Sequence, residues 1–413
     1  MRTALLRGLT TGLGLAMSGL GLAATTATPA QAAPAKYEDC PTGYFCAWTN
    51  DNATGPMLKV KTDQPTLGAF DNKIRATSNR TDKIACLYSE PNYGYGSYWA
   101  DQPNGPGGGS SGPAESDKSS IKFVLTDREC GLNAYPNWYS EVSPAKAGFG
   151  DLNNDRRADV LVRDEVGRLW FLPGDGTGKQ VGTGWNVMST LTRHGDFTRD
   201  GKEDLLAREA STGKLWAYPG RGDGGFDDRR LIGASGWNGM SLITAFGDLT
   251  GDGRSDLVAR ETSTGKLWLY PGTASGGLAD RILIGRSGWG VMDALIGSGD
   301  MNGDGRPDLL AREASTGKLW LYPGTASGGL ADRILTGRSG WGVMGNFIAV
   351  GDYSGDGVND LATITNDKYT ADGWSSPGHW GWLLSYEGQG NGNGYVKDHR
   401  QVDGDWYRLN GAF

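Results

Sequence analysis

Apolar residues occur along most of this chain in short runs, separated by turns rich in Gly, Ser, Thr and Asp. One stretch shows the pattern clearly, with runs at Asp308–Arg312, Lys318–Tyr322, Arg333–Leu335 and Asn346–Val350. Polar turns such as Ala314–Gly317 lie between these runs. Runs of this length bounded by turn residues predict β-strands. We therefore expect an all-β protein with almost no helix.

The unit of four predicted strands repeats along the C-terminal two-thirds of the chain. Segments Ala259–Met292 and Ala311–Met344 differ at only two of 34 positions. A Gly-Asp pair opens each of five units, and its aspartates are spaced 45, 52, 52 and 52 residues apart. Four strands in each unit predict the blades of a β-propeller. A β-solenoid is the competing interpretation, which the length of the unit and its tryptophans disfavour. We predict about five four-stranded blades in residues 148–413.

Two segments are candidates for completing the ring of blades. Asp405–Phe413, at the end of the last unit, matches Gly340–Met344, which precedes the next Gly-Asp pair. Asn137–Tyr139 resembles an N-terminal copy of the same strand. We expect one of these two segments to complete the first or the last sheet.

Each unit opens with a nine-residue acidic loop. It has Asp at positions 1, 5 and 9 and Asn, Thr or Ser at position 3. The five sets, named the first to the fifth acidic loop, are Asp151, Asn153, Asp155, Asp159; Asp196, Thr198, Asp200, Asp204; Asp248, Thr250, Asp252, Asp256; Asp300, Asn302, Asp304, Asp308; and Asp352, Ser354, Asp356, Asp360. Calcium prefers six to eight oxygen ligands, and these side chains with a backbone carbonyl and a water supply about that number. The sequence predicts up to five Ca²⁺ ions, against the alternative of five solvated acidic turns.

Position 6 distinguishes the first loop from the others. Gly201, Gly253, Gly305 and Gly357 permit the positive φ of a sharp turn, whereas the first loop has Arg156. We expect the first site to be the weakest or empty. In all five loops, neighbouring carboxylates repel one another unless a cation lies between them.

The segments Phe149–Asn153 and Gly303–Leu309 resemble the FG-GAP (VCBS-type) repeat family, integrin-alpha-like propeller repeats. The resemblance covers residues 148–413. It implies blades that bind calcium in these loops and a role in recognition or adhesion. Seven blades are better known in that family than the five counted here.

The N-terminus predicts export. Arg2 and Arg7 precede an apolar run from Gly8 to Ala24, and Ala30-Gln31-Ala32 has the form that signal peptidase accepts. We predict a signal peptide over 1–32, cleaved near Ala32, and a secreted, extracellular protein without a membrane span. The net charge of −7 becomes −9 when both arginines leave, so nucleic acid is an unfavourable partner.

All four cysteines lie before the repeats, at Cys40, Cys46, Cys86 and Cys130. An even number in an exported chain predicts disulfides, for which three pairings exist. Residues 33–133 form a predicted N-terminal domain, and 134–147 a linker or first outer strand.

The segments Cys40–Trp48 and Ala85–Gly96 each pass from a strand into an aromatic turn. They resemble a two-motif βγ-crystallin-like Greek-key domain and the secreted bacterial metalloproteinase-inhibitor family of that fold. The favoured pairings are Cys40 with Cys46 and Cys86 with Cys130. The resemblance implies a protease partner, with Ala85–Tyr88 as the candidate for the segment that enters the protease cleft. We assign no calcium to this domain.

Two series of tryptophans accompany the repeats. We expect the first series, in mid-strand, to be core. The second, in the loop before the last strand of each unit, is predicted to wedge between blades, with a ring of sugar-binding pockets as the alternative. The first series is Trp170, Trp216, Trp268 and Trp320, and the second is Trp185, Trp237, Trp289, Trp341 and Trp406.

No catalytic residue is predicted. The three histidines, His194, His379 and His399, form no zinc-type pair, and no Gly-x-Ser-x-Gly sequence occurs. The leading hypothesis is a non-enzymatic secreted calcium-binding protein that joins a peptidase-inhibitor domain to a recognition propeller. The alternatives are a lectin or adhesion protein with a cell-surface or glycan ligand, and an extracellular hydrolase with a propeller appendage.

Overall fold

The computed structural model describes residues 37–94, 96–111, 116–144, 150–370, 378, 380–389 and 400–413. The predicted signal peptide, His379 and His399 lie outside these residues. Within them, the structure consists of β-strands and 3₁₀ turns of three or four residues, so the all-β prediction is confirmed. No helix in the described ranges is long and apolar enough to cross a membrane.

The chain divides into two compact units. Unit 1 consists of Met1–Asp82, Leu87–Gly96 and Pro103–Ile121. Unit 2 consists of Lys83–Cys86, Ser97–Gln102 and Lys122–Phe413, and it contains all the acidic loops.

The cysteine-containing part of the chain forms two antiparallel sheets. One has the strand order β2-β1-β3-β6, and the other has the order β5-β4-β7. Their bounds are β1 Phe45–Asn50, β2 Thr54–Val60, β3 Ala76–Asn79, β4 Ile84–Tyr88, β5 Tyr98–Asp101, β6 Ser110–Ser111 and β7 Ser120–Val124. The 3₁₀ turns are η1 Tyr37–Asp39, η2 Asp51–Ala53, η3 Gly68–Phe70, η4 Pro91–Tyr93 and η6 Asp127–Cys130. The favoured disulfides, Cys40–Cys46 and Cys86–Cys130, are both present.

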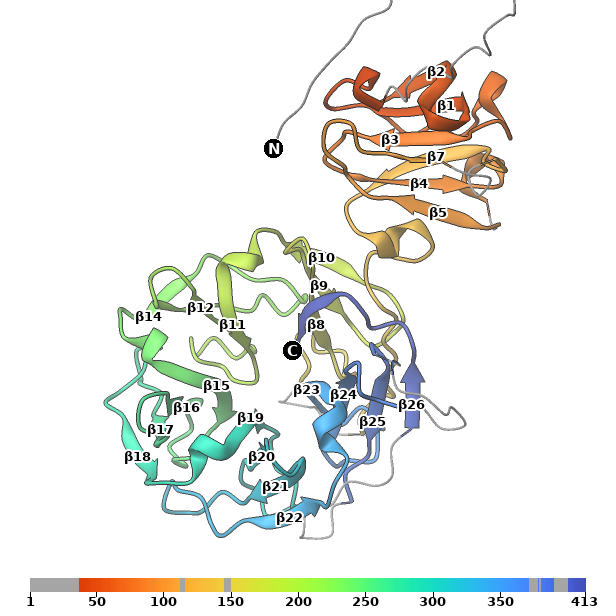
Figure 1. Ribbon diagram of the computed structural model, residues 1–413. Helices are drawn as coiled ribbons and strands as arrows, with labels where there is room; N and C mark the ends of the chain where they lie inside the picture. Colours follow the sequence, from red (N-terminus) through yellow and green to blue (C-terminus); the bar gives the residue numbers. More distant parts are fainter. Residues whose placement is uncertain are drawn as a thin grey trace, which may run out of the picture. The chain divides into compact units, whose positions relative to one another are not determined.

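The repeats form five four-stranded antiparallel sheets, which lie around a common centre (Figure 1). The first sheet has the order β10-β9-β8-β27, and the second to fifth are β11–β14, β15–β18, β19–β22 and β23–β26. The bounds of the first two are β8 Val160–Asp164, β9 Leu169–Leu172, β10 Lys179–Gly182, β27 Leu409–Ala412, β11 Met188–Thr192, β12 Leu205–Glu209, β13 Leu215–Tyr218 and β14 Arg230–Gly233. Those of the other three are β15 Met240–Gly247, β16 Asp256–Glu261, β17 Leu267–Tyr270, β18 Ile282–Gly285, β19 Met292–Gly297, β20 Leu309–Glu313, β21 Lys318–Tyr322, β22 Ile334–Gly337, β23 Met344–Gly351, β24 Asp360–Thr365, β25 Leu383–Tyr386 and β26 Arg400–Asp403.

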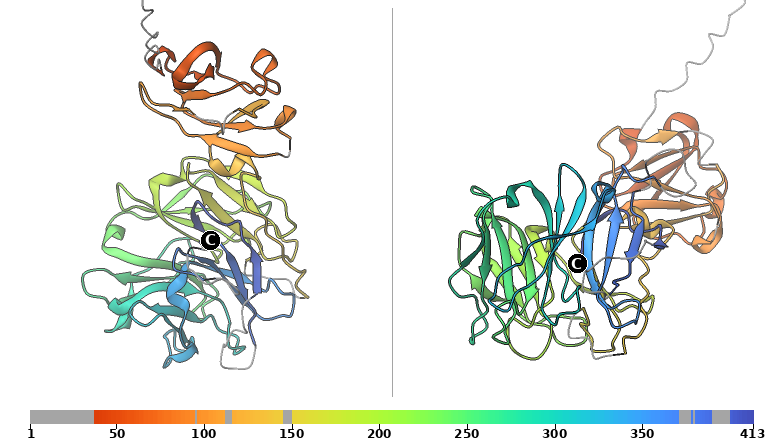
Figure 2. Two further views of the ribbon diagram at one scale, coloured as in Figure 1. Left: turned by 45° about the vertical axis from the view of Figure 1, so that its right-hand side comes forward. Right: turned by 90° about the horizontal axis from the view of Figure 1, so that it is seen from below.

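The sequence repeat and the sheets are offset by one strand. The unit that opens at Asp300 contributes β20, β21 and β22 to the fourth sheet, but its last strand, β23, begins the fifth sheet. The same offset leaves the first sheet without an innermost strand. The C-terminal β27 supplies it, with Leu409 opposite Asp164 and Ala412 opposite Val162. The end of the chain, just after β27, is marked C in Figure 2. Asn137–Tyr139 forms no strand, so the C-terminal copy completes this sheet.

The first tryptophan series is not fully buried, contrary to the core prediction. In β21, Leu319 and Leu321 are completely buried, whereas Trp320 between them is half-buried on the opposite face. The Arg333 guanidinium carbon lies 3.9 Å from the centroid of the Trp320 ring, a cation–π contact. Arg229 and Arg281 cover Trp216 and Trp268 in the same way. Strand alternation therefore directs these rings to the solvent side, where arginines cover them.

The second series is buried, as the wedge interpretation expects. Four of its members open the 3₁₀ turns η7 Trp185–Val187, η8 Trp237–Gly239, η9 Trp289–Val291 and η10 Trp341–Val343. Trp289 packs among Leu267 and Leu269 of the third sheet and Leu309 of the fourth. A Cβ on Gly285 would lie 2.0 Å from Nε1 of Trp289, so only glycine fits beside this ring. These tryptophans therefore fill the space between neighbouring sheets.

Four arginines join neighbouring sheets just beside these tryptophans. Each junction arginine lies on the second strand of one sheet and donates from Nη1 to two backbone carbonyls of the next sheet. Arg163 donates to Trp185 and Met188, Arg208 to Trp237 and Met240, Arg260 to Trp289 and Met292, and Arg312 to Trp341 and Met344. The Arg163 distances are 2.9 and 2.7 Å. Each guanidinium thus bonds the first carbonyl of a 3₁₀ turn and the first carbonyl of the innermost strand that follows it.

The junction between the fifth and first sheets uses apolar packing instead. Trp138 and Trp406 are almost fully buried, with ring centroids 6.1 Å apart. They pack with Ile364 of β24 and with Val162 of β8. Nε1 of Trp138 donates to the carbonyl of Ala158 at 2.6 Å. The two segments considered for completing the ring, Asn137–Tyr139 and Asp405–Phe413, therefore each contribute a tryptophan to this core.

We predict that Arg260→Met lowers the free energy of unfolding by about 2 to 3 kcal/mol, because charged hydrogen bonds to two carbonyls are lost. Arg286→Met is the matched control, since Arg286 is exposed and has no recorded partner in the described structure. Denaturant unfolding of the two variants measures the difference. Equal stability of both would show that the junction hydrogen bonds do not hold the sheets together.

Candidate metal centre

The second to fifth acidic loops lie between the innermost strand of a sheet and its second strand, and the first acidic loop directly precedes β8, the second strand of the first sheet. The second loop, for example, begins after β11 ends at Thr192 and finishes just before β12 begins at Leu205. The innermost strand starts at the 3₁₀ turn with the buried tryptophan. The acidic loops therefore lie at one end of the innermost strands, and the carbonyls that accept from the junction arginines lie at the other end.

The aspartate at position 9 is the buried member of each loop. Asp159, Asp204, Asp256, Asp308 and Asp360 are all completely buried. In the fourth loop, Oδ2 of Asp308 accepts from the amides of Met301 and Asn302 at 3.0 and 3.1 Å, and Oδ1 accepts from Gly324 at 3.0 Å. Equivalent glycine amides bond the position-9 carboxylate in the second, third and fifth loops. Backbone amides thus hold a carboxylate that burial would otherwise destabilise.

The aspartates at positions 1 and 5 shape the turn. In the third loop, Oδ1 of Asp248 accepts from the amide of Asp252 at 2.9 Å, and Oδ2 accepts from Gly253 at 2.7 Å. Asp252 in turn accepts from the amide of Arg254 at 3.0 Å. The same three bonds occur in the other four loops. The loops therefore share one conformation, fixed by their own carboxylates.

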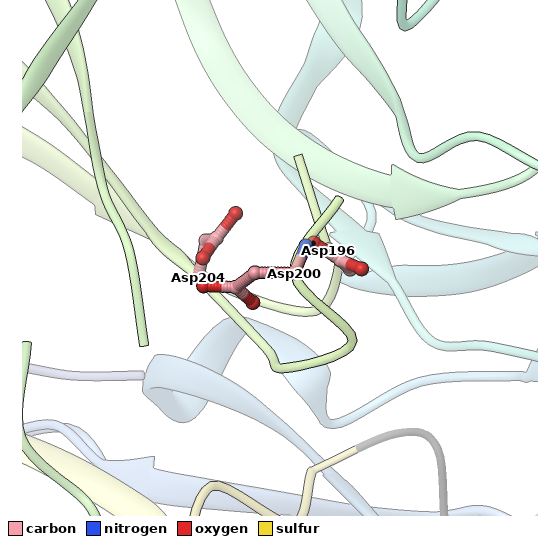
Figure 3. A group of neighbouring side chains, drawn as sticks. All are labelled: Asp196, Asp200 and Asp204. Atoms are coloured by element: carbon pink, nitrogen blue, oxygen red, sulfur yellow. Dashed lines mark hydrogen bonds between the residues drawn. The ribbon is translucent and has the colours of Figure 1, made fainter. Parts of the chain in front are cut away.

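The second loop brings its carboxylates closest together. One oxygen from each of Asp196, Asp200 and Asp204 lies within 4.8 Å of the others, and no other set of three acidic, Cys or His residues in the described ranges does so. Figure 3 shows the three side chains on this single loop. The donor set consists of oxygens, which suits a hard cation such as calcium better than zinc.

Burial changes the proton affinity of the position-9 carboxyls. It raises the pKa of Asp159 to about 8, of Asp308 and Asp360 to about 7, and of Asp204 to about 6. The neighbouring aspartates at positions 1 or 5 raise these pKa values further. Without a cation, these four carboxyl groups therefore titrate near neutral pH.

The first loop keeps the common turn despite Arg156. The φ of Arg156 is +70°, in the region that favours glycine and that Gly201, Gly253, Gly305 and Gly357 occupy in the other loops. Oδ1 of Asp159 is buried without a hydrogen-bond partner in the described structure, whereas its equivalents accept from a glycine amide. The first loop thus differs from the others in the charge and backbone strain at Arg156, while its turn is preserved.

Sequence reasoning missed a buried group that links the first two loops. Glu203 accepts from Nε of Arg193 at 2.7 Å and from the amides of His194 and Gly150 at 3.0 and 3.1 Å. Arg193 also donates to the carbonyl of Asp159 at 2.6 Å. Although burial by itself raises the pKa of Glu203, the Arg193 charge and His194 hold it well below its ordinary value. The only sequence signal was the replacement of apolar residues by Arg193-His194 before the second loop.

The structure does not support the segment suggested for the protease cleft. Ala85–Tyr88 lies in β4, the central strand of its sheet, and Leu87 is completely buried. By contrast, the residues at 41–43 are exposed within the loop that the Cys40–Cys46 disulfide closes. Arg80 fixes this loop by donating to the Cys40 carbonyl and to Oγ1 of Thr42, both at 2.9 Å. The rigid exposed loop is therefore at the first disulfide.

Comparison with solved structures gives distant likenesses. A structure titled for the evolution of the eye lens βγ-crystallin domain fold is 12% identical, covers 21% of this chain and 91% of its own, and has a TM-score of 0.19. The N-terminal domain of protein S is 16% identical over 20% of this chain and 97% of its own, with a TM-score of 0.17. The Photorhabdus luminescens Tc holotoxin pore is 14% identical over 86% of this chain and 16% of its own, with a TM-score of 0.36. At these TM-scores, none of them defines the fold or function of this chain.

Comparison with family models is more specific, although no curated protein matches the chain. Peptidase inhibitor family I36 matches residues 33–100. The FG-GAP-like repeat matches 196–259, 248–311 and 300–363, so each matched window contains two acidic loops. Both resemblances expected from the sequence are confirmed: the chain carries a peptidase inhibitor family I36 segment followed by three FG-GAP-like repeats.

Proposed function

We propose that this protein is an exported, non-enzymatic recognition protein, in which an inhibitor domain at 33–133 is joined through 134–147 to a calcium-binding propeller at 148–413. The match of residues 33–100 to the inhibitor family carries the proposal. Neither matched family is a catalytic one. Two disulfides fit an oxidising, extracellular location.

The partner of the inhibitor domain is an extracellular metalloprotease, and the contact loop is the one at residues 41–43. A disulfide and Arg80 hold this loop before binding, so little conformational entropy is lost when it enters a cleft. Tyr44 at its end is covered by the ammonium groups of Lys59 and Lys61, at 5.1 and 4.3 Å from the ring centroid. The loop thus leads into β1 beside two positively charged side chains, Lys59 of β2 and Lys61 just after it.

The acidic loops are the calcium sites, up to five in number and weakest in the first loop. Five loops with the same hydrogen bonds place three carboxylates and a polar residue around one turn, and the second loop already brings three carboxylate oxygens together. A calcium ion there would neutralise carboxylates that burial destabilises. The repeat region contains no cysteine and so no disulfide. We propose that calcium stabilises it instead, by binding only to the folded state.

The five sheets are the blades of the propeller, and β27 closes the ring by completing the first blade. The pairing of β27 with β8 and the placement of the sheets around one centre support this closure (Figure 1). The glycan alternative was based on an exposed tryptophan ring at Trp185, Trp237, Trp289, Trp341 and Trp406. These side chains are at most 8% exposed, so they offer no stacking surface for a sugar.

Removing one carboxylate should remove one calcium site. Asp200→Asn keeps the shape of the second loop, because Asn can accept the same bond from Lys202, but it lowers the site charge. We expect calorimetric titration to lose one calcium equivalent, or to show that site weakened by about tenfold or more. Asp228→Asn, at an exposed aspartate in the connection before β14, is the control and should bind calcium as the unmodified protein does. Identical titrations for both variants would reject the second loop as a site.

Calcium affinity should increase with pH. The calcium-free folded protein holds protons on Asp308 and Asp360 up to about pH 7, whereas the unfolded chain releases them near pH 4. Through this window the folded state binds more protons, so these groups lower the stability of the calcium-free protein as pH rises. Calcium must displace the same protons, so we expect its affinity to rise about tenfold between about pH 5.5 and 7.5. A flat affinity across this range would contradict the raised pKa values.

The full-length exported chain should inhibit a thermolysin-type metalloprotease stoichiometrically. Thr42→Trp adds bulk at the exposed loop and is expected to weaken inhibition by about tenfold or more, since a clash in a pre-formed cleft costs over 1.4 kcal/mol. Thr66→Trp is the control, because Thr66 is exposed outside the disulfide loop. Measuring residual peptidase activity against inhibitor concentration tests the proposal. Absence of inhibition by the unmodified chain would reject the inhibitor function, and equal weakening by both variants would reject the loop assignment.

A further inference from the structure

The junction between the fifth and first sheets lacks the arginine that the other four junctions share. Arg312 follows Asp308 by four residues and pairs with Leu319 in the sheet register. At the same place in the fifth sheet, Ile364 follows Asp360 by four residues and pairs with Leu383. The fifth junction therefore has an apolar side chain where the others have a guanidinium.

The acceptor side of this junction is nevertheless retained. Trp406 occupies the place of Trp341, because its amide donates to Gly381 as the amide of Trp341 donates to Gly317. Leu409, three residues after Trp406, corresponds to Met344, and both residues begin an innermost strand. The carbonyls of Trp341 and Met344 are the ones that accept hydrogen bonds from Arg312.

A cavity of about 490 Å³ is found where the missing side chain would lie. Ile364, Trp406 and Leu409 all line it, together with Trp380, Asn346 and Asn410. This volume is within the range of small-ligand sites. An open space thus replaces the guanidinium that fills the equivalent position in the other junctions.

The lining supplies aromatic faces and hydrogen-bond acceptors. The side chain of Trp380 is 46% exposed, and its ring centroid is 5.5 Å from that of Tyr407. Nδ2 of Asn346 donates to the Ala412 carbonyl at 2.8 Å, and Nδ2 of Asn410 donates to Oδ1 of Asn186 at 3.1 Å. Both amide donors are therefore used within the described structure, which leaves the Oδ1 acceptors for a ligand.

One cationic residue, Arg408, also lines the cavity. Its guanidinium pairs with the carboxylate of Asp127 at 2.8 Å, within the same compact unit. This pairing offsets a positive charge that would otherwise oppose a cationic ligand. A ligand suited to the remaining groups is planar, rich in N–H donors and able to stack on an aromatic ring, and the guanidinium group meets all three conditions.

We propose that this cavity binds an arginine side chain of a partner protein, which supplies in trans the guanidinium that Arg163, Arg208, Arg260 and Arg312 supply in cis. The partner's guanidinium would donate to the acceptors at Trp406, Leu409 and the two asparagines, and would stack on Trp380. The site is separate from the acidic loops, since it lies at the other end of the innermost strands.

Ligand-observed NMR on the full chain with calcium present tests the site, with N-acetyl-arginine methylamide as the probe. N-acetyl-citrulline methylamide is the matched probe, because it has the same length without the charge. We expect saturable binding of the arginine probe, and at least about tenfold weaker binding of the citrulline probe, as expected when charged hydrogen bonds are lost. No binding of the arginine probe, or equal binding of both, would overturn the proposal.

Two variants locate the binding. Ile364→Arg restores the arginine of the other junctions and should abolish probe binding by filling the cavity, whereas Ile364→Met should retain it. If Ile364→Arg does not fold, Trp380→Ala removes the exposed aromatic face without changing the core and should weaken binding by about tenfold. Probe binding that is unchanged in the folded Ile364→Arg variant, or in Trp380→Ala, would place the arginine elsewhere and reject the assignment.

Discussion

The hydrogen bonds from one guanidinium to two carbonyls of the next sheet are the contact on which the arrangement of the repeats depends. A sheet of four short strands has too little core to be stable alone, so each must bury a face against its neighbours. The tryptophan that fills this interface, for example Trp289, opens a 3₁₀ turn in which its own carbonyl accepts from the amide of Met292. Arg260 of the preceding sheet donates a second hydrogen bond to this carbonyl and another to the carbonyl of Met292. At each of these junctions, the tryptophan thus provides apolar packing and the neighbouring arginine provides hydrogen bonds to backbone carbonyls.

The other end of each innermost strand presents the opposite electrostatic problem. There, a buried aspartate such as Asp308 faces two further carboxylates, and backbone amides satisfy only part of its hydrogen-bonding capacity. Burial raises its pKa, so the calcium-free loop accommodates charge poorly at neutral pH. A divalent cation between these carboxylates would offset their mutual repulsion. The proposed propeller would then be held by arginines at one end of its strands and by calcium at the other.

Much of this organisation could be predicted from the sequence. The acidic loops and the four-strand repeat follow from spacing, because turn residues constrain local geometry directly. The even number of cysteines predicted disulfides but left three pairings open, of which the structure has the favoured one. The burial of the tryptophans was harder to predict. Trp320 was predicted to be core from its place in mid-strand, but the alternation directs Leu319 and Leu321 inward and Trp320 outward under Arg333. Arg312 gave no signal, since an arginine near a strand end ordinarily indicates solvent, and its acceptors lie 29 and 32 residues away. Ile364 stands where the other four sheets have an arginine, and this difference can be recognised as important only after the role of Arg312 is known.

The central claim is that the acidic loops are calcium sites that stabilise the repeat region. Thermal unfolding of the full exported chain, first stripped of calcium and then with saturating calcium, tests it most directly. Binding to the folded state alone contributes about 2.7 kcal/mol for each site at a hundredfold excess over its dissociation constant. The account predicts that calcium raises the melting temperature by several degrees or more, and that magnesium at the same concentration has a smaller effect. The same transition with and without calcium would contradict it.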